Sequence, residues 1–353
     1  MTDQTTIRVA VNGYGVIGKR VADAVAAQDD MTLAGIADVA TDWRMRVVLQ
    51  KGYPLFGAAN EHVEAMRDAG LDAQGNLGDL MGAADVIVDC TPKKIAAQNV
   101  ERYREAEIKF IVQGGEKHAV TGHSFSAENN YDSALGRDST RVVSCNTTST
   151  VRTLTALKRA GLLKKARGVL IRRATDPWES HLGGIMNTLV PEEEIPSHQG
   201  PDAQTVDPDL DVVTMAVKAP QTLAHLHYWT VELTRSATKE EVLDVFRSST
   251  RIASIRMSDG LTALNAVKEL MADLGRPHDN LYEVALWADM LKVEGTELFY
   301  AYMVDNQAIV IPETIDAIRA LTEAETDAQV SIERTNKALG ITGQLAEATL
   351  RPV

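Results

Sequence analysis

The first 145 residues alternate short apolar runs with amphipathic stretches. The apolar runs are rich in Val and Ile, several lack polar alternation, and they span residues 6–11, 33–38, 85–90, 108–113 and 140–145. Runs of this kind are typical of parallel strands that are covered on both faces. Helical periodicity fills residues 16–28 and 93–107 between them. The rhythm predicts an α/β fold with a doubly wound parallel sheet.

The pattern changes from residue 167 onward. Longer strand-like runs follow, with few helices directly between them, at 168–177, 211–220, 226–235 and 298–312. This spacing predicts an α+β second domain with a mostly antiparallel sheet, covered on one face by helices near 238–249 and 262–275. In the tail, Pro312 suits a first helical turn, and Thr326 with Gln329 has the spacing of a capping box.

Length and composition predict two domains in a soluble protein. A chain of 353 residues exceeds the size of one usual core. We expect a nucleotide-binding domain in 1–144, with C-terminal helices of 312–353 packed back on it, and a second domain in 145–311. The net charge of −13 argues against nucleic-acid and anionic-membrane partners. Two cysteines, no signal-peptide pattern and no membrane-spanning run favour a cytoplasmic protein.

A glycine-rich turn lies between the first strand and the first helix. Its glycines are Gly13, Gly15 and Gly18, in the stretch N-G-Y-G-V-I-G. They permit a tight turn, close approach of pyrophosphate and close helix packing, and the helix start at Val16 and Ile17 offers free N–H groups. Asp38 closes the second strand 20 residues after Gly18.

This context predicts a Rossmann dinucleotide site. Asp38 would accept from both ribose hydroxyls and repel a 2′-phosphate, so NAD is favoured over NADP. The alternatives are a glycine-rich turn without a ligand and a simple exposed carboxylate at a strand end.

Cys145 lies where a strand-like run gives way to a helix-like segment begun by Thr147 and Thr148. A nucleophilic thiol needs a helix N-terminus, a histidine or another cation to favour its thiolate. Cys90 is the contrast, because Pro92 follows it and no helix start is aimed at it. We interpret Cys90 as buried packing. The residues alone leave Cys145 open to either role.

Seven stretches carry a resemblance that extends over nearly the whole chain. They are, in order, NGYGVIGKRVADAV, QGGEKH, SCNTT, RRATDP, TLAHLH, IVIPETIDAIRA and SIERTNKALGI. Together they resemble the archaeal-type (type II) glyceraldehyde-3-phosphate dehydrogenases. The resemblance implies oxidation of D-glyceraldehyde 3-phosphate by NAD(P) and inorganic phosphate to 1,3-bisphosphoglycerate. It implies Cys145 as the nucleophile that forms a thiohemiacetal and then a thioester.

The resemblance also assigns roles to other residues. It implies His225 as the base, with His227 in reserve; the two alternate and so face one side of a strand. An H-x-H pair can bind metal, but no third ligand cluster has suitable spacing, so no metal is expected. The implied further cofactor contacts are Gly115, Arg173 and Gln307. The candidate substrate contacts are Ser144, Asn146, Thr147, Thr148, Arg172, His198, Gln199 and Gly200. A homotetramer is also implied.

The sequence departs from these relatives at several places. Many of them read H-H-G where this chain has His198-Gln199-Gly200, and Ser149-Thr150 replaces the usual Gly-Leu. Relatives commonly carry a lysine that suits NADP where this chain has Asp38. The region 58–82 is longer than usual and receives no role. Two alternatives stay open: a related dehydrogenase of erythrose 4-phosphate or aspartate semialdehyde, and a nucleotide-sensing or scaffolding protein without activity.

Overall fold

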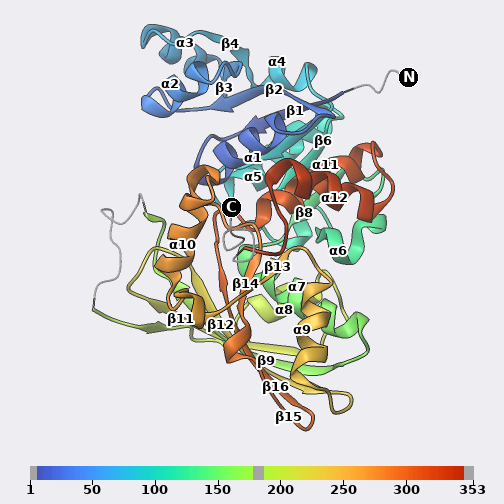
Figure 1. Ribbon diagram of the computed structural model, residues 1–353. Helices are drawn as coiled ribbons and strands as arrows, with labels where there is room; N and C mark the ends of the chain where they lie inside the picture. Colours follow the sequence, from blue (N-terminus) through green and yellow to red (C-terminus); the bar gives the residue numbers. More distant parts are fainter. Residues whose placement is uncertain (1–5, 178–186, 346–353) are drawn as a thin grey trace. The chain divides into compact units, whose positions relative to one another are not determined.

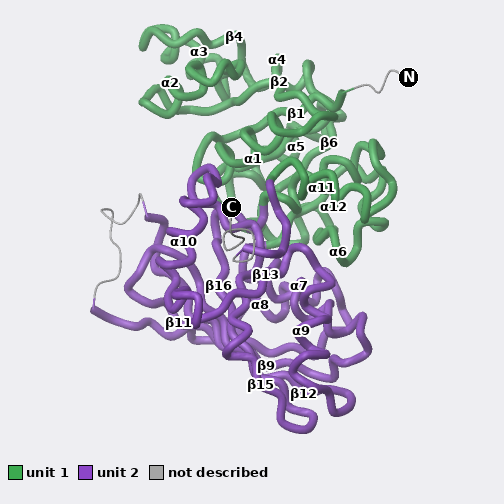
Figure 2. The backbone as a smooth tube through the Cα atoms, viewed as in Figure 1, with its two compact units in different colours: residues 1–143, 311–339 green, residues 144–310, 340–353 purple. Residues whose placement is uncertain are grey.

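The computed structural model describes residues 6–177 and 187–345. The chain divides into two compact units, which are coloured separately in Figure 2. Unit 1 comprises residues 1–143 and 311–339, and unit 2 comprises residues 144–310 and 340–353. The predicted helical tail beyond residue 340 therefore falls in unit 2, and residues 346–353 lie outside the described part.

Unit 1 is built on a sheet of eight strands, and every pairing in it is parallel. The spatial order is β4-β3-β2-β1-β5-β6-β8-β7. The strands are β1 (Ile7–Asn12), β2 (Met31–Asp38), β3 (Leu55–Gly57), β4 (Ala73–Asn76), β5 (Val86–Asp89), β6 (Lys109–Val112), β7 (Ser124–Phe125) and β8 (Ser139–Val142). The helices are α1 (Val16–Ala26), α2 (Trp43–Gln50), α3 (Asn60–Asp68), α4 (Leu77–Gly82), α5 (Ile95–Glu105), α6 (Ala127–Asn130), α11 (Val310–Thr322) and α12 (Ala328–Leu339).

The doubly wound parallel fold predicted from the sequence is confirmed. The central strand β5 is buried along its whole length, as its uninterrupted apolar run requires. The sequence missed β3, β4 and β7, which have three, four and two residues. The region 58–82, which had no assigned role, contributes α3, β4 and α4 and extends one edge of this sheet (Figure 1).

Unit 2 is built on a mixed sheet of order β10-β11-β9-β12-β16-β14-β13, with β15 paired to β16. Its strands are β9 (Leu163–Arg173), β10 (Val190–Pro191), β11 (Val212–Ala219), β12 (His225–Leu233), β13 (Ile252–Ile255), β14 (Val284–Trp287), β15 (Lys292–Glu294) and β16 (Glu297–Val304). The helices are α7 (Cys145–Arg159), α8 (Gln199–Gln204), α9 (Lys239–Arg247) and α10 (Leu264–Asp273). Five pairings are antiparallel and two are parallel, so the predicted mostly antiparallel sheet is confirmed.

Local polar contacts move three element boundaries away from their predicted positions. The run 298–312 is not one strand: β16 ends at Val304, and Asp305 accepts the Gln307 N–H at 2.9 Å in the turn before α11. The predicted Thr326–Gln329 capping box is wrong, because Asp327 Oδ1 accepts the N–H groups of Gln329 and Val330 that open α12. Helix α7 begins at Cys145 itself, two residues before the predicted start.

Candidate active site

The glycine-rich loop of unit 1 has a backbone conformation that requires glycine at Gly13 and Gly18. Gly13 has a φ of +93°, and a Cβ there would lie 3.1 Å from the backbone of Cys90. A Cβ on Gly18 would overlap the carbonyl oxygen of Gly13. At Gly15, by contrast, nothing lies within 4 Å of the Cβ position. The open space at Gly15 and the free N–H groups of Val16 and Ile17 at the start of α1 fit a pyrophosphate.

Asp38 ties the end of β2 to this loop. Its Oδ2 accepts the Tyr14 N–H at 2.6 Å, and its Oδ1 accepts the N–H groups of Val39 at 2.7 Å and Ala40 at 2.9 Å. A carboxylate has about four acceptor positions, so one is left for a ribose hydroxyl. The predicted contact to both hydroxyls would require one of these backbone bonds to give way.

The loop that carries Gly115 is held by polar side chains of the Q-G-G-E-K-H stretch. Gln113 Nε2 donates to Thr314 Oγ1 at 3.2 Å, and Glu116 Oε1 accepts the Lys94 N–H at 2.5 Å. The buried Oε1 of Gln113 has no hydrogen-bond partner among the described residues. This acceptor, two residues before Gly115, is available to a ligand that binds at the carboxyl end of β6.

Cys145 is the first residue of α7, in unit 2. Ser144 is the N-cap, and its Oγ accepts the Thr147 N–H. The Cys145 Sγ lies 3.5 Å from Nε2 of His225, which opens β12. Burial raises the pKa of the Cys145 thiol to about 11, against the opposing charges of Arg173 and Arg172. The thiol is therefore protonated at neutral pH in this ligand-free arrangement.

His225 is held in one tautomer by the backbone. Its Nδ1 accepts the N–H of Arg173 at 3.0 Å, so the neutral ring carries its proton on Nε2. Burial lowers the pKa of His225 well below its ordinary value, and neighbouring His227 and arginines lower it further. The ring is neutral, and its Nε2–H faces the Cys145 sulfur.

His227, the reserve candidate, is engaged at both ring nitrogens. Its Nε2–H donates to Asn146 Oδ1 at 2.9 Å, and its Nδ1 accepts the hydroxyl of Tyr302 at 3.0 Å. The Tyr302 oxygen in turn accepts the Trp229 Nε1–H at 3.0 Å. Burial lowers the pKa of His227 to about 3. These buried contacts hold the side chain of Asn146 in place, one residue after the nucleophile.

The predicted substrate residues divide into two groups. Ser144, Asn146, Thr147 and Thr148 open α7 beside Cys145, and Thr147 Oγ1 donates to Asp202 Oδ2 at 2.7 Å. His198 precedes α8, which Gln199 and Gly200 begin and which packs on α7. The amide atoms of buried Gln199 have no partner among the described residues.

Arg172 is a predicted substrate residue whose positive charge acts on the thiol. Its guanidinium lowers the pKa of Cys145. It forms an ion pair with Glu192, a residue that the sequence analysis did not single out. His198 Nδ1 lies 3.5 Å from the same carboxylate.

Two of the predicted cofactor residues meet within unit 2. Arg173 Nη2 donates to Asp176 Oδ1 at 2.6 Å, and Gln307 Nε2 donates to the same oxygen at 2.9 Å. The sequence missed Asp176 as their common partner, although it stands in the R-R-A-T-D-P stretch. The other predicted cofactor residues, namely the glycine-rich loop, Asp38 and Gly115, belong to unit 1.

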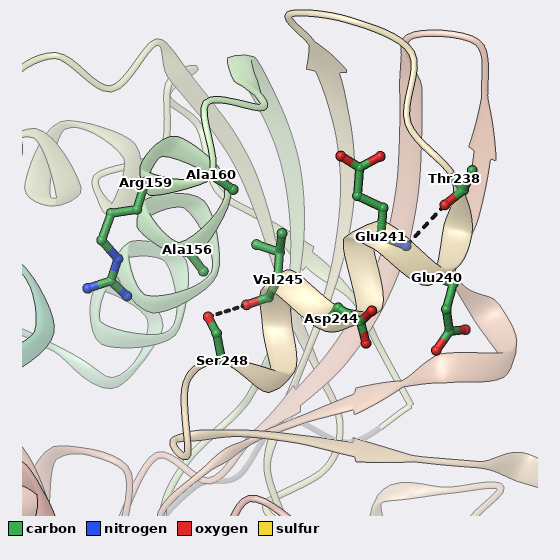
Figure 3. A pocket seen from close by; sticks show the side chains of 9 residues that line it. All are labelled: Ala156, Arg159, Ala160, Thr238, Glu240, Glu241, Asp244, Val245 and Ser248. Atoms are coloured by element: carbon green, nitrogen blue, oxygen red, sulfur yellow. Dashed lines mark hydrogen bonds between the residues drawn. The ribbon is translucent and has the colours of Figure 1, made fainter.

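A groove of about 750 Å³ lies away from all of these residues, between α7 and α9 (Figure 3). It is lined by Ala156, Arg159, Ala160, Thr238, Glu240, Glu241, Asp244, Val245 and Ser248. Its acidic side chains are paired with arginines: Glu241 with Arg235 at 2.6 Å, and Glu240 and Asp244 with Arg247. We therefore interpret the groove as a seam between helices.

Other kinds of site find no support in the described part of the chain. Within residues 6–177 and 187–345, no three His, Cys, Asp or Glu side chains gather in a way that could hold a metal ion. Over the same ranges, no helix has the length and apolar character needed to cross a bilayer.

Two known protein families match separate parts of the chain. Residues 144–273 match the family described as glyceraldehyde 3-phosphate dehydrogenase, C-terminal domain. Residues 7–147 match the family described as dihydrodipicolinate reductase, N-terminus.

Full-length relatives give a consistent result. The chain is 45% identical over 335 residues to the glyceraldehyde-3-phosphate dehydrogenase of Methanobrevibacter smithii, covering 94% of this chain and 99% of the relative. It is 46% identical over 338 residues to the protein of that name from Methanococcoides burtonii, covering 96% and 100%. The protein of that name from Methanothermus fervidus is 42% identical over 334 residues, covering 94% and 98%. The chain therefore belongs to the archaeal-type glyceraldehyde-3-phosphate dehydrogenase family of nicotinamide-dependent oxidoreductases.

Proposed function

We propose that this chain is a phosphorylating glyceraldehyde-3-phosphate dehydrogenase that uses NAD, with NADP less favoured. One observation carries the proposal: Cys145 opens a helix of 15 residues, and its sulfur lies 3.5 Å from His225 Nε2. A thiol at a helix start with an imidazole in reach is the arrangement that covalent catalysis on an aldehyde requires.

The reaction begins when the Cys145 thiol gives its proton to water and Sγ bonds to the aldehyde carbon. The carbonyl π pair moves to oxygen, and the Nε2–H of His225 is placed to donate to this oxyanion. Asn146, whose Oδ1 is occupied by His227, has its amide nitrogen left for the same charge. When bound, the nicotinamide supplies a hydride acceptor. Loss of hydride from the carbon re-forms the carbonyl as a thioester. A hydrogen phosphate oxygen then bonds to the thioester carbon, its proton passes to water, and the C–S bond breaks to return the sulfur as a thiolate.

His225 has two conceivable roles in this scheme. The base role predicted from the sequence requires Nε2 to be without its proton before hydride transfer. In the tautomer that the Arg173 N–H selects, Nε2 is a donor, and hydride can leave directly from the oxyanion without a separate base. We propose the donor role for this chain, because the N–H of Arg173 occupies Nδ1.

Phosphate recognition falls to cationic and hydroxyl groups near the thiol. We propose Arg172, His198, Thr147 and Thr148 for the phosphate of the substrate and for inorganic phosphate. Ser144 caps α7, and Gln199 and Gly200 shape the start of α8. An arginine fork matches two phosphate oxygens at once, which a lysine cannot do.

NAD preference is proposed from Asp38. A fixed carboxylate at the end of β2 disfavours a 2′-phosphate by like-charge repulsion. The remaining proposed contacts are the glycine-rich loop, Gly115, Arg173 and Gln307. We also propose that residues 1–144 with the C-terminal helices form the NAD-binding domain, that residues 145–311 form the catalytic domain, and that the enzyme is a cytoplasmic homotetramer.

The decisive test is the initial rate of NAD reduction with D-glyceraldehyde 3-phosphate, with and without inorganic phosphate. Phosphate-dependent turnover that vanishes in Cys145→Ser supports the proposal. Turnover only with erythrose 4-phosphate or aspartate semialdehyde would replace the substrate. NAD binding without turnover on any aldehyde would instead support a nucleotide-sensing protein.

A further inference from the structure

Glu192 places a negative charge beside Arg172 and His198, two of the residues proposed to bind phosphate. Its carboxylate contacts Arg172 Nη1 directly through Oε1, and its Oε2 lies 3.5 Å from His198 Nδ1. The Glu192 side chain is 19% exposed and that of Arg172 is 22% exposed, so water screens the pair only in part. One carboxylate therefore engages both Arg172 and His198 in the ligand-free protein.

The backbone and the side chain of Glu192 have different freedom. Its N–H donates to the Ala216 carbonyl at 2.9 Å, which extends the pairing of β10 with β11 by one residue. The following residues, Glu193 and Glu194, are exposed. The side chain can therefore turn away from Arg172 by rotating its own torsion angles, without loss of the strand pairing.

Arg172 is incompletely satisfied by this partner. Its Nε is buried and has no hydrogen-bond partner among the described residues. A planar guanidinium binds best when two adjacent N–H groups meet two oxygens of one anion. The contact from Glu192 to Nη1 leaves Nε unused, whereas a phosphate could occupy the whole edge of the guanidinium.

We propose that Glu192 is an internal competitor for the anion site formed by Arg172 and His198, and that phosphate must displace it to bind. This inference rests on the proposed function and names the residue that tunes its phosphate affinity. A carboxylate and a phosphate dianion cannot share one arginine without strong repulsion. The fraction of molecules in which Glu192 has turned away then sets the apparent affinity.

The competitor lowers the affinity for every anion that must displace it by the same factor, because that factor is the fraction of molecules in which Glu192 has turned away. The preference among anions comes from Arg172 itself, where a phosphate dianion carries more charge than a monoanion such as acetate. Glu192 therefore keeps a weakly bound carboxylate out of the site at concentrations at which phosphate still enters.

The test compares Glu192→Gln with Glu193→Gln, which removes the same charge from an exposed neighbour. Dissociation constants of the ligand-free protein for inorganic phosphate and for acetate are measured by calorimetry. We expect Glu192→Gln to lower the dissociation constants for phosphate and for acetate by a similar factor of about ten, because both anions must displace the same side chain. Glu193→Gln should change either constant less than about twofold. In an Arg172→Gln background, the effect of Glu192→Gln should disappear.

A second measurement uses Cys145 as an internal probe. The positive charge of Arg172 lowers the pKa of the thiol, and Glu192 opposes that charge. Glu192→Gln should therefore speed alkylation of Cys145 by iodoacetamide near pH 8, and Glu193→Gln should not. If Glu192→Gln does not fold, Glu192→Asp, which is one methylene shorter, should show smaller changes in the same directions.

Equal effects of Glu192→Gln and Glu193→Gln, or unchanged phosphate binding together with unchanged alkylation, would overturn the inference. The proposed function can fail separately. Tighter phosphate binding in Glu192→Gln without turnover on glyceraldehyde 3-phosphate would support the competitor and reject the reaction. Normal phosphate-dependent turnover together with an unchanged phosphate dissociation constant in Glu192→Gln would support the proposed reaction and reject Glu192 as a competitor.

Discussion

The two cysteines of this chain follow strands of the same kind but have opposite surroundings. Cys90 comes directly after β5, and Cys145 comes three residues after β8. Burial raises the pKa of both thiols. At Cys90 the negative charge of Asp89 raises the pKa further, whereas at Cys145 two arginines oppose the effect of burial. Burial is common to the two sites, so the surrounding charges and the partner imidazole distinguish the nucleophile.

The backbone and Cβ of Cys90 pack against the glycine-rich loop. Its backbone closes against Gly13, and a Cβ on Gly18 would lie 3.3 Å from the Cys90 Cβ. Cys90 therefore forms the floor of the glycine-rich loop, within unit 1. A larger side chain there would displace the loop, while a serine would fit.

The sharpest test of this comparison exchanges each sulfur for oxygen. We expect Cys145→Ser to lower kcat by about 10⁴-fold or more, because a hydroxyl lacks the nucleophilicity of a thiolate. NAD binding, measured by calorimetry, should stay within about twofold. Cys90→Ser should keep its turnover and lose about 1 kcal/mol of unfolding free energy. Loss of turnover in Cys90→Ser with NAD binding intact would reverse the assignment.

The next largest effect is expected at His225, because Cys145 has this imidazole partner and Cys90 has no corresponding one among the described residues. His225→Ala should lower kcat/KM by about 10²- to 10⁴-fold, because it removes the Nε2–H donor beside the sulfur. His227→Ala is the matched control and should cost less, since His227 acts through Asn146. If His225 is a donor, kcat should not fall at low pH with the titration of a base. A bell-shaped profile with an acid limb that His225→Ala removes would show the base role.

The charge difference between the cysteines predicts a pH dependence of alkylation. Because the pKa of Cys145 is raised to about 11, its thiol is protonated at neutral pH, and the thiolate fraction grows about tenfold per pH unit. The iodoacetamide rate of the ligand-free protein should therefore rise steadily from about pH 7 to about pH 9. Cys90, whose pKa is raised well above its ordinary value, should stay unreactive. A plateau reached below pH 7 would instead show a thiolate–imidazolium pair.

The contrast between these cysteines also shows how far sequence reasoning reaches. The parallel strands, the glycine-rich turn and the start of α7 follow from patterns within a few residues, so they could be predicted. The partners of Cys145 come from β9 and β12, and no local pattern specifies that the Arg173 N–H meets His225 Nδ1. For the same reason the sequence analysis did not find Glu192, which contacts Arg172 from directly after another strand, β10. The predicted start of α12 was wrong because Asp327, and not Thr326, caps the helix.

The smallest expected effect concerns the cofactor loop above Cys90. Asp38→Asn removes one negative charge but keeps an oxygen that can accept the Tyr14 N–H or the N–H groups of Val39 and Ala40. We expect the ratio of kcat/KM for NAD to that for NADP to fall about tenfold, through weaker repulsion of the 2′-phosphate. Asp72→Asn, at an exposed position in the same unit, is the charge control and should leave the ratio unchanged. An equal fall in both variants would mean that net charge, and not contact at the ribose, sets the preference. If the NAD:NADP ratio is unchanged in both variants, Asp38 serves only to hold the glycine-rich loop in place, as the packing of Cys90 against Gly13 and Gly18 does.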